Sequence, residues 1–150
     1  MGNLRIKLLR DRRGYSMTFW AVFIGLVLIP ALAFAIELGR YFYAISEVQK
    51  AADAAAVAAA AEINQRVFQD TGSLTSTSKT WANAQSYVSS NTIGLSAKGV
   101  YAFVTGIQVS GGDNTVRVNV SANLSILFPS VVPNVTVTQT GIAKLRAFTH

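Results

Sequence analysis

Two periodicities divide the chain into a helical N-terminal part and a C-terminal part of strands. For about 23 residues, from Gly14 to Ile36, no side chain is charged, and Phe, Trp, Val, Ile and Leu dominate. A helix of that length spans roughly 30–35 Å, the thickness of a bilayer's hydrocarbon core. Pro30 should kink this helix, which membrane helices tolerate. A cleaved secretory signal has a shorter apolar core, so we interpret the segment as a retained anchor. A cut near Ala31–Ala33 is the alternative.

The helical pattern continues beyond the apolar run. Residues 37–69 contain no Gly after Gly39 and no Pro. Apolar and small side chains recur there at three- and four-residue steps, which is one stripe of a helix. The stripe consists of Leu38, Tyr41, Ile45, Val48, Ala52, Ala55 and Ala59. The sequence therefore predicts one helix from about Ser16 to Phe68, ended by the residues at 70–72.

Alanines dominate the outer part of this helix. Ala52, Ala55, Ala56 and Ala59 form a face of small side chains just after the predicted membrane exit. High helix propensity alone is one interpretation; close packing against a neighbouring element is the other. We favour packing, because an alanine stripe buries little area unless something lies on it. We expect the outer part to lie under the chain's own sheet and the part nearer the membrane to contact another subunit.

The C-terminal part predicts a short helix and three strands. Trp81, Ala84 and Val88 share one face of a helix expected near Lys79–Ser89. Four apolar residues then alternate as in a strand (Tyr101, Phe103, Ile107 and Val109) before a Gly-Gly-Asp-Asn turn at 111–114. The segment 116–126 alternates apolar and polar residues, as in an antiparallel strand with one solvated face. Pro129–Pro133 interrupts it, and a third strand follows through Val135, Val137, Ala143 and Leu145. The predicted fold class is α+β, a long helix continuing into a small head with a short helix and a three-stranded antiparallel sheet.

The positive charge is concentrated at the N-terminus. The 150-residue chain has a formal net charge of +6, but five Lys or Arg residues precede Gly14. A basic flank on an apolar helix predicts a cytoplasmic N-terminus and an extracytoplasmic head in the cytoplasmic membrane. It does not form a stripe on a folded surface, so we expect no nucleic-acid partner.

Catalytic chemistry is not indicated. The chain has no cysteine, and its one histidine is the terminal His150. Glu37, Glu47, Asp53 and Glu62 are spread along a helix without converging, and no serine lies in a nucleophile motif. We therefore predict neither an enzyme nor a cofactor or metal site. Asn119, Asn123 and Asn134 each begin an Asn-x-Ser/Thr sequon, but they fall on polar strand faces where these residues are ordinary.

The N-terminal segment resembles a known family. Arg12-Arg13-Gly14, the apolar helix with Pro30, Glu37-Leu38-Gly39-Arg40 and the Gln49–Ala56 block occur in the order and spacing seen in TadE/TadG-like proteins of tight-adherence pilus systems. The resemblance covers about residues 12–61. It implies a single-span protein with a pilin-like fold that acts as a minor pilin or an envelope assembly component.

The resemblance also implies a leader-processing site at Arg13, Gly14 and Tyr15. Processed pilins of this kind usually have Glu at the fifth position after the cleaved Gly, where this chain has Phe19. Larger relatives add a metal-binding adhesion domain whose motif is absent here. We therefore expect uncut chains to be at least as common as cut ones.

These observations predict four segments: a basic leader (1–14), a transmembrane helix (15–37), a helical stalk (38–69) and an extracytoplasmic head (70–150). The leading hypothesis is a non-enzymatic pilus-type membrane protein whose partners are the membrane and other subunits or copies of itself. An accessory structural subunit of a larger membrane complex is the first alternative. A surface adhesin or binding module is the second.

Overall fold

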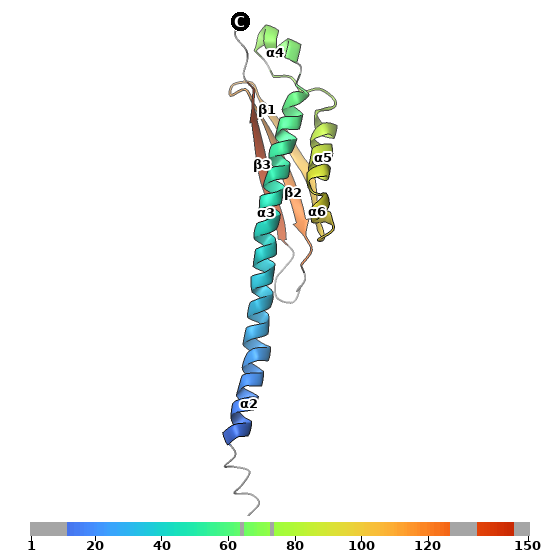
Figure 1. The fold of residues 1–150 in the computed structure, drawn as a ribbon. Coiled ribbons are helices and arrows are strands. Elements are labelled where there is room, and N and C mark those ends of the chain that lie inside the picture. The colour runs from blue at the N-terminus through green and yellow to red at the C-terminus, as the bar shows by residue number, and fades with distance from the viewer. Residues whose placement is uncertain (1–11, 64, 73, 127–134, 146–150) are drawn as a thin grey trace, which may run out of the picture.

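The computed structural model describes residues 12–63, 65–72, 74–126 and 135–145. It shows a long helical rod with a small head around one end (Figure 1). The rod consists of α2 (Arg12–Phe23), η1 (Ile24–Leu28) and α3 (Ile29–Ala61), which follow one another without a break. About 50 helical residues correspond to a rod of roughly 75 Å. The predicted α+β class, with a long apolar helix before a small mixed head, is confirmed.

The rod adapts to Pro30 through a single π-helical segment. Proline has no N–H to donate, and its ring would press on the carbonyl of Leu26 four residues earlier. In η1 the backbone hydrogen bonds join residues five apart instead of four, and the Ile29 N–H donates to the Ile24 carbonyl. A π segment of this kind adds room in the backbone next to the proline. The helix therefore accommodates Pro30 by widening one turn.

The helix ends at Ala61 and not near Phe68 as the pattern predicts. Glu62 leaves helical geometry with φ −90° and ψ 7°, and Ile63 is buried and forms an isolated bridge with Ser76. The segment beyond it forms a separate short helix, α4 (Gln65–Thr71). Ile63, at the turn between the two helices, is buried in the core, as is Phe68 in α4. The apolar pattern therefore continues past the end of α3 although the helix does not.

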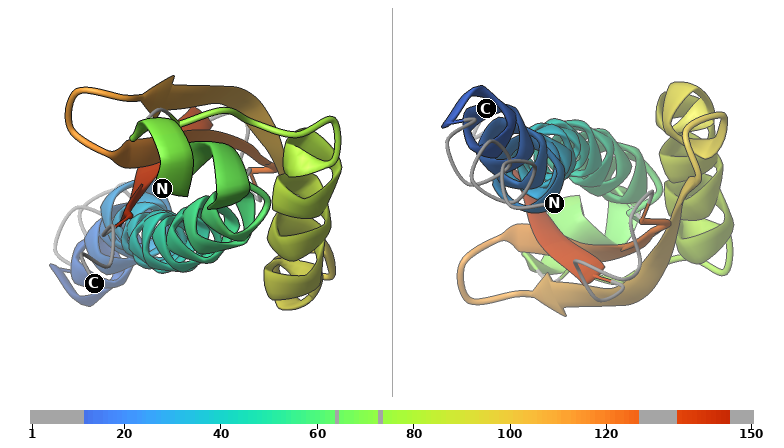
Figure 2. Two further views of the ribbon diagram at one scale, coloured as in Figure 1. Left: turned by 90° about the horizontal axis from the view of Figure 1, so that it is seen from above. Right: turned by 90° about the horizontal axis from the view of Figure 1, so that it is seen from below.

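Two helices follow, α5 (Thr80–Asn91) and α6 (Ile93–Ser96). Figure 2 shows α5 running beside the outer half of α3. Ala84 and Val88 are fully buried against it, whereas Trp81 is 49% exposed. Trp81, expected on the same face of the helix, lies at its edge and lines a shallow hollow with residues 76–80 and with Ile107 and Val109 of the first strand.

The three strands form an antiparallel meander in the order β1 (Val100–Ser110), β2 (Thr115–Leu124) and β3 (Val135–Lys144). The expected turn at 111–114 joins β1 to β2, and Asn114 adopts a left-handed φ of 52°, which asparagine tolerates better than most residues. The Pro129–Pro133 crossing and His150 lie outside the described residues.

The alternation predicted for β2 is confirmed. Its core face consists of Val116, Val118, Val120, Ala122 and Leu124, all buried. In β1 the prediction is half wrong, because the pairing register shifts between Val104 and Gly106. A one-residue bulge exchanges the two faces of a strand. Tyr101 and Phe103 therefore lie outside, while Ile107 and Val109 pack against the core.

The core of the head lies between the sheet, α5 and the outer half of α3. Seen along the rod, the sheet wraps one side of α3 and α5 covers another (Figure 2). Helix α3 contacts β2, β3 and α5. The largest fully buried side chains are valines: Val48, Val88, Val116, Val118 and Val120. The outer half of α3 is thus the central element of the head.

Candidate functional site

The inner half of the rod presents apolar side chains to its surroundings. Between Gly14 and Ile36, large apolar residues are mostly about half to three-quarters exposed, with Leu26 at 74%. Within the described chain, Gly14–Ala61 is the one helix long and apolar enough to cross a membrane. A continuous apolar surface of this size requires lipid or another protein to cover it.

Aromatic side chains cluster near the inner end of this surface. Phe19, Trp20 and Phe23 form a group with ring centroids 5.9 to 6.3 Å apart. Tyr15 precedes them and is 80% exposed. Trp and Tyr gather at membrane–water interfaces, where their amphipathic rings are favoured. Phe19, the residue found where processed pilins usually carry Glu, belongs to this group.

At the outer end of the apolar segment, an ion pair joins the rod to the head. Glu37 is buried, and both of its carboxylate oxygens accept from Arg40 Nη1, at 3.2 and 3.1 Å. The other terminal nitrogen of Arg40 donates to the backbone carbonyls of Lys98 (3.0 Å) and Ser125 (3.2 Å). These carbonyls belong to the turn before β1 and the end of β2, so one guanidinium group holds both to the rod.

Neighbouring contacts reinforce this junction. The Lys98 ammonium lies 4.3 Å from the centre of the Tyr43 ring, a cation–π distance. Gly99 has a φ of +75° and its carbonyl accepts from the Ser125 N–H at 3.0 Å. A side chain on Gly99 would be strained and would press against Ser125. We call Glu37, Arg40, Lys98, Gly99 and Ser125 the junction clamp.

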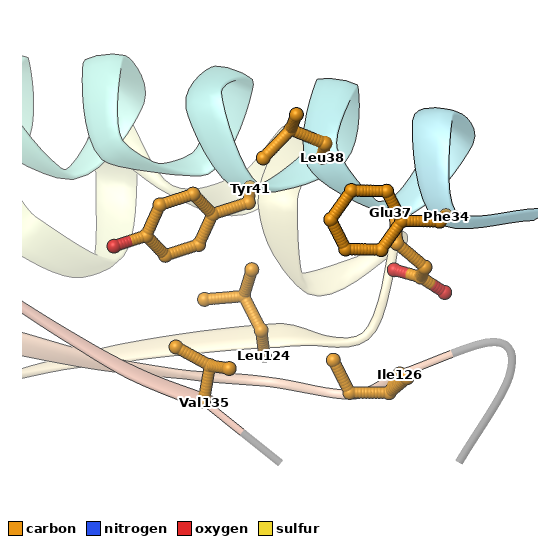
Figure 3. Close-up of a pocket in the computed structure, with 7 residues that line it drawn as sticks. All are labelled: Phe34, Glu37, Leu38, Tyr41, Leu124, Ile126 and Val135. Carbon is orange, nitrogen blue, oxygen red and sulfur yellow. The ribbon is translucent and has the colours of Figure 1, made fainter. Parts of the chain in front are cut away.

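An apolar groove lies next to the junction clamp. Phe34, Leu38 and Tyr41 of α3 face Leu124 and Val135 of the sheet and Ile126, just after β2, across it, with Glu37 at one end (Figure 3). The cavity measures about 250 Å³. The groove continues the apolar surface of the inner half of the rod onto the head.

The predicted packing residues lie under the chain's own head. Ala52, Ala55, Ala56 and Ala59 have no exposed surface and belong to the hydrophobic core. The approach is closest at Gly141 of β3, where an added Cβ would lie only 2.0 Å from the Ala52 carbonyl oxygen. The Gln49 amide also reaches β3, donating to the Thr140 carbonyl at 3.3 Å. Small side chains on both elements allow this contact.

The predicted processing residues lie at the start of the rod. Arg13, Gly14 and Tyr15 are helical in α2. A Cβ added to Gly14 would have no neighbouring atom within 4 Å, so the space beside this glycine is open. The Gly14 carbonyl accepts from the Thr18 hydroxyl at 2.9 Å. The structure places these three residues far from the head.

The acidic residues of α3 are held separately. Glu37 pairs with Arg40, Glu47 with Lys50, and Asp53 accepts from Gln49. The hydrogen bond and charge of Glu47 raise the pKa of the exposed Lys50, an effect confined to the surface. Among the residues that the structure describes, no group of three or more potential metal ligands occurs.

The sequence analysis did not predict the contacts of Arg40 at the junction or the close approach at Gly141. The spacing of Glu37 and Arg40 is an i, i+3 pair and could have predicted the ion pair. The carbonyl partners at Lys98 and Ser125 have no signature in residue type. Gly141, an isolated glycine in a strand, is the usual signal of a close backbone approach.

The comparisons with known proteins concern the rod. Residues 14–62 match the model of a family described as Flp pilus-assembly TadE/G-like. The resemblance predicted from the sequence is confirmed over this segment, which contains the apolar surface, the Glu37–Arg40 pair and the four packing alanines. No curated protein and no solved structure matches the chain.

Proposed function

We propose that this chain is a non-enzymatic, single-span subunit of a pilus-assembly system, similar to a minor pilin. The observation that carries the proposal is the match over residues 14–62, which coincides with the one described helix that can cross a membrane. The exposed apolar segment would lie in the cytoplasmic membrane, with residues 1–14 in the cytoplasm and the head outside. Other membrane subunits, or copies of this chain, would pack along the rod.

The junction clamp supports this role. A subunit that transmits force or position along its helix needs a head that cannot swing on it. Arg40 links the rod to two separate segments of the head, and Gly141 brings β3 onto the helix backbone. Rod and head are thereby joined into one body, and the apolar segment and the groove beside it stay open for partner subunits.

A photo-crosslinking experiment tests the proposal. A photoreactive residue at Leu26, 74% exposed in the apolar segment, is compared with one at Val57, 63% exposed at the level of the head. We expect Leu26 to give a protein adduct of defined mass in the cells that make this protein, and Val57 to give less. Lipid adducts alone at Leu26 would contradict partner packing along the rod.

The first alternative, an accessory subunit of a larger membrane complex, is favoured by Phe19. In a processed pilin the residue at this position is usually Glu, whereas here it is an exposed phenylalanine in an aromatic group. Deletion of the gene separates the two functions. Loss of a pilus subunit should reduce the yield of surface filaments. Loss of an accessory subunit should leave the filaments intact and destabilise the complex to which the subunit belongs.

A further inference from the structure

The face of the sheet turned away from α3 has an unusual composition. We call it the outer sheet face. Its residues align in columns along the three strands: Tyr101 and Phe103 on β1; Asn119, Ser121 and Asn123 on β2; and Thr136, Thr138 and Thr140 on β3. The solvated face of an antiparallel sheet is polar as a rule. These eight side chains carry no charge, whereas Arg117 of β2 and Lys144 of β3 lie on the same face nearer the β1–β2 turn. Two large aromatic rings are nevertheless exposed, Tyr101 at 64% and Phe103 at 41%.

Side-chain hydrogen bonds fix the polar columns in place. The Thr136 hydroxyl donates to Asn123 Oδ1 at 3.0 Å, and the Thr140 hydroxyl donates to Asn119 Oδ1 at 2.8 Å. Each asparagine oxygen is therefore occupied from the β3 side. Among the residues that the structure describes, none accepts a hydrogen bond from the amide nitrogen, which carries two donors. The face thus presents oriented N–H donors on a rigid support.

A hollow lies at one end of this face. It measures about 320 Å³ and is lined by Gly99, Tyr101, Asn123, Leu124, Ser125, Val135 and Thr136. Its size is within the range of small-molecule sites. The lining combines one aromatic ring, one amide and two hydroxyls without a charged side chain. Tyr101, Asn123 and Thr136 form a single row, because Asn123 pairs with both of the others.

We propose that this hollow binds an uncharged saccharide. A sugar ring has an apolar C–H face, which would lie on the Tyr101 ring, and a rim of hydroxyls. Those hydroxyls would accept from Asn123 Nδ2 and exchange hydrogen bonds with the Ser125 and Thr136 hydroxyls. A phosphate or carboxylate ligand lacks a cation here, so the uncharged lining favours a neutral sugar. Strand-borne side chains locked by second contacts are typical of preorganised sites.

The same arrangement explains the two Asn-x-Ser sequons that begin at Asn119 and Asn123 of β2. Residues two apart on a strand share one face, so Asn119, Ser121 and Asn123 point outward together. The Asn-x-Ser spacing then follows from the placing of polar residues at every second position of β2, on the outer sheet face. The inference goes beyond the proposed role in pilus assembly and does not depend on it.

The test uses the full chain in phospholipid nanodiscs, because sugar-based detergents would compete for the site. Saturation-transfer NMR follows titrations with maltoheptaose, cellohexaose, chitohexaose and dextran, with polygalacturonate as the charged comparison. The variants are Tyr101→Ala, Asn123→Ala and the ring-preserving Tyr101→Phe. Tyr87→Ala is the matched control, a tyrosine 52% exposed on α5. Thermal melts verify that each variant is folded.

We expect saturable binding of at least one neutral saccharide. Tyr101→Ala and Asn123→Ala should each weaken it about tenfold or more, the equivalent of one good contact, while Tyr101→Phe and Tyr87→Ala retain it. The proposal fails if no neutral saccharide in the panel saturates, if only polygalacturonate binds, or if Tyr87→Ala weakens binding equally. It fails also if Tyr101→Ala changes the oligomeric state without sugar, since the face would then be a protein interface.

Discussion

Gly141 allows strand β3 to lie directly on the backbone of α3. A methyl group at this position would overlap the Ala52 carbonyl oxygen at 2.0 Å, and neither backbone can move without disturbing the sheet. We expect Gly141→Ala to lower the free energy of unfolding by about 1 to 3 kcal/mol or more, as overpacking does. Denaturant unfolding in nanodiscs measures it. Gly106→Ala is the control, a strand glycine whose added Cβ would meet only Asn119 Nδ2 at 3.5 Å. Equal stability of the two variants would show that β3 lies farther from α3.

Arg40 is the residue through which the rod holds the head. Arg40→Met keeps a long side chain but removes the ion pair with buried Glu37 and two bonds to backbone carbonyls. Hydrogen bonds to charged groups are strong enough that we expect a loss of about 1 to 3 kcal/mol in unfolding free energy. Hydrogen exchange should also rise at Lys98 and Ser125.

The matched control for Arg40 is Lys50→Met, which breaks the exposed pair with Glu47 on the same helix. Exposed pairs of this kind add little to stability, so that variant should resemble the unmodified protein. If Arg40→Met behaved as Lys50→Met does, the junction would be held by apolar contacts alone.

At the scale of elements, the alanine face is the contact that organises the head. Ala55 and Ala59 have no exposed surface, so leucine at either position must displace a neighbour. We expect Ala55→Leu and Ala59→Leu each to cost about 1 to 3 kcal/mol in unfolding free energy. Ala61→Leu, at an exposed position of the same helix, should cost only a few tenths, because leucine is a good helix former. Unchanged stability in both buried variants would mean that this face is open to solvent.

The sequence predicts the buried face of an element whose apolar residues recur at a constant spacing. It does not predict the buried face of an element in which a bulge or break shifts that spacing. The alternation in β2 and the helical stripe of α3 both identify their buried faces. In β1 the bulge before Gly106 exchanges the faces midway, so the four alternating apolar residues do not share one side of the sheet. The glycine was the available signal, since an isolated glycine in a strand often marks a bulge. The junction clamp was beyond prediction, because its acceptors are backbone carbonyls 58 and 85 residues from Arg40.

At the scale of the whole molecule, the inner end of the rod decides between the two proposed roles. The proposed processing site, Arg13-Gly14-Tyr15, begins the rod, and Phe19 stands where glutamate is usual in processed pilins. We expect intact-mass measurement of the purified protein to find uncut chains at least as abundant as chains beginning at Tyr15. Cut chains alone would contradict this and would favour a filament subunit over an accessory one.

The orientation of the whole molecule follows from charge on one side of the apolar segment. Five Lys or Arg residues precede Gly14, and basic flanks stay in the cytoplasm, so the head should lie outside. The chain has no cysteine, which allows single cysteines to report accessibility without background. We expect Asp113→Cys, in the turn between β1 and β2, to react with a membrane-impermeant maleimide in intact cells. Asn3→Cys, in the leader, should react only after permeabilisation, and Asp113→Cys should react equally in both conditions. The reverse pattern would place the head in the cytoplasm, where it could not meet an external partner, and the assembly role would then lose its setting.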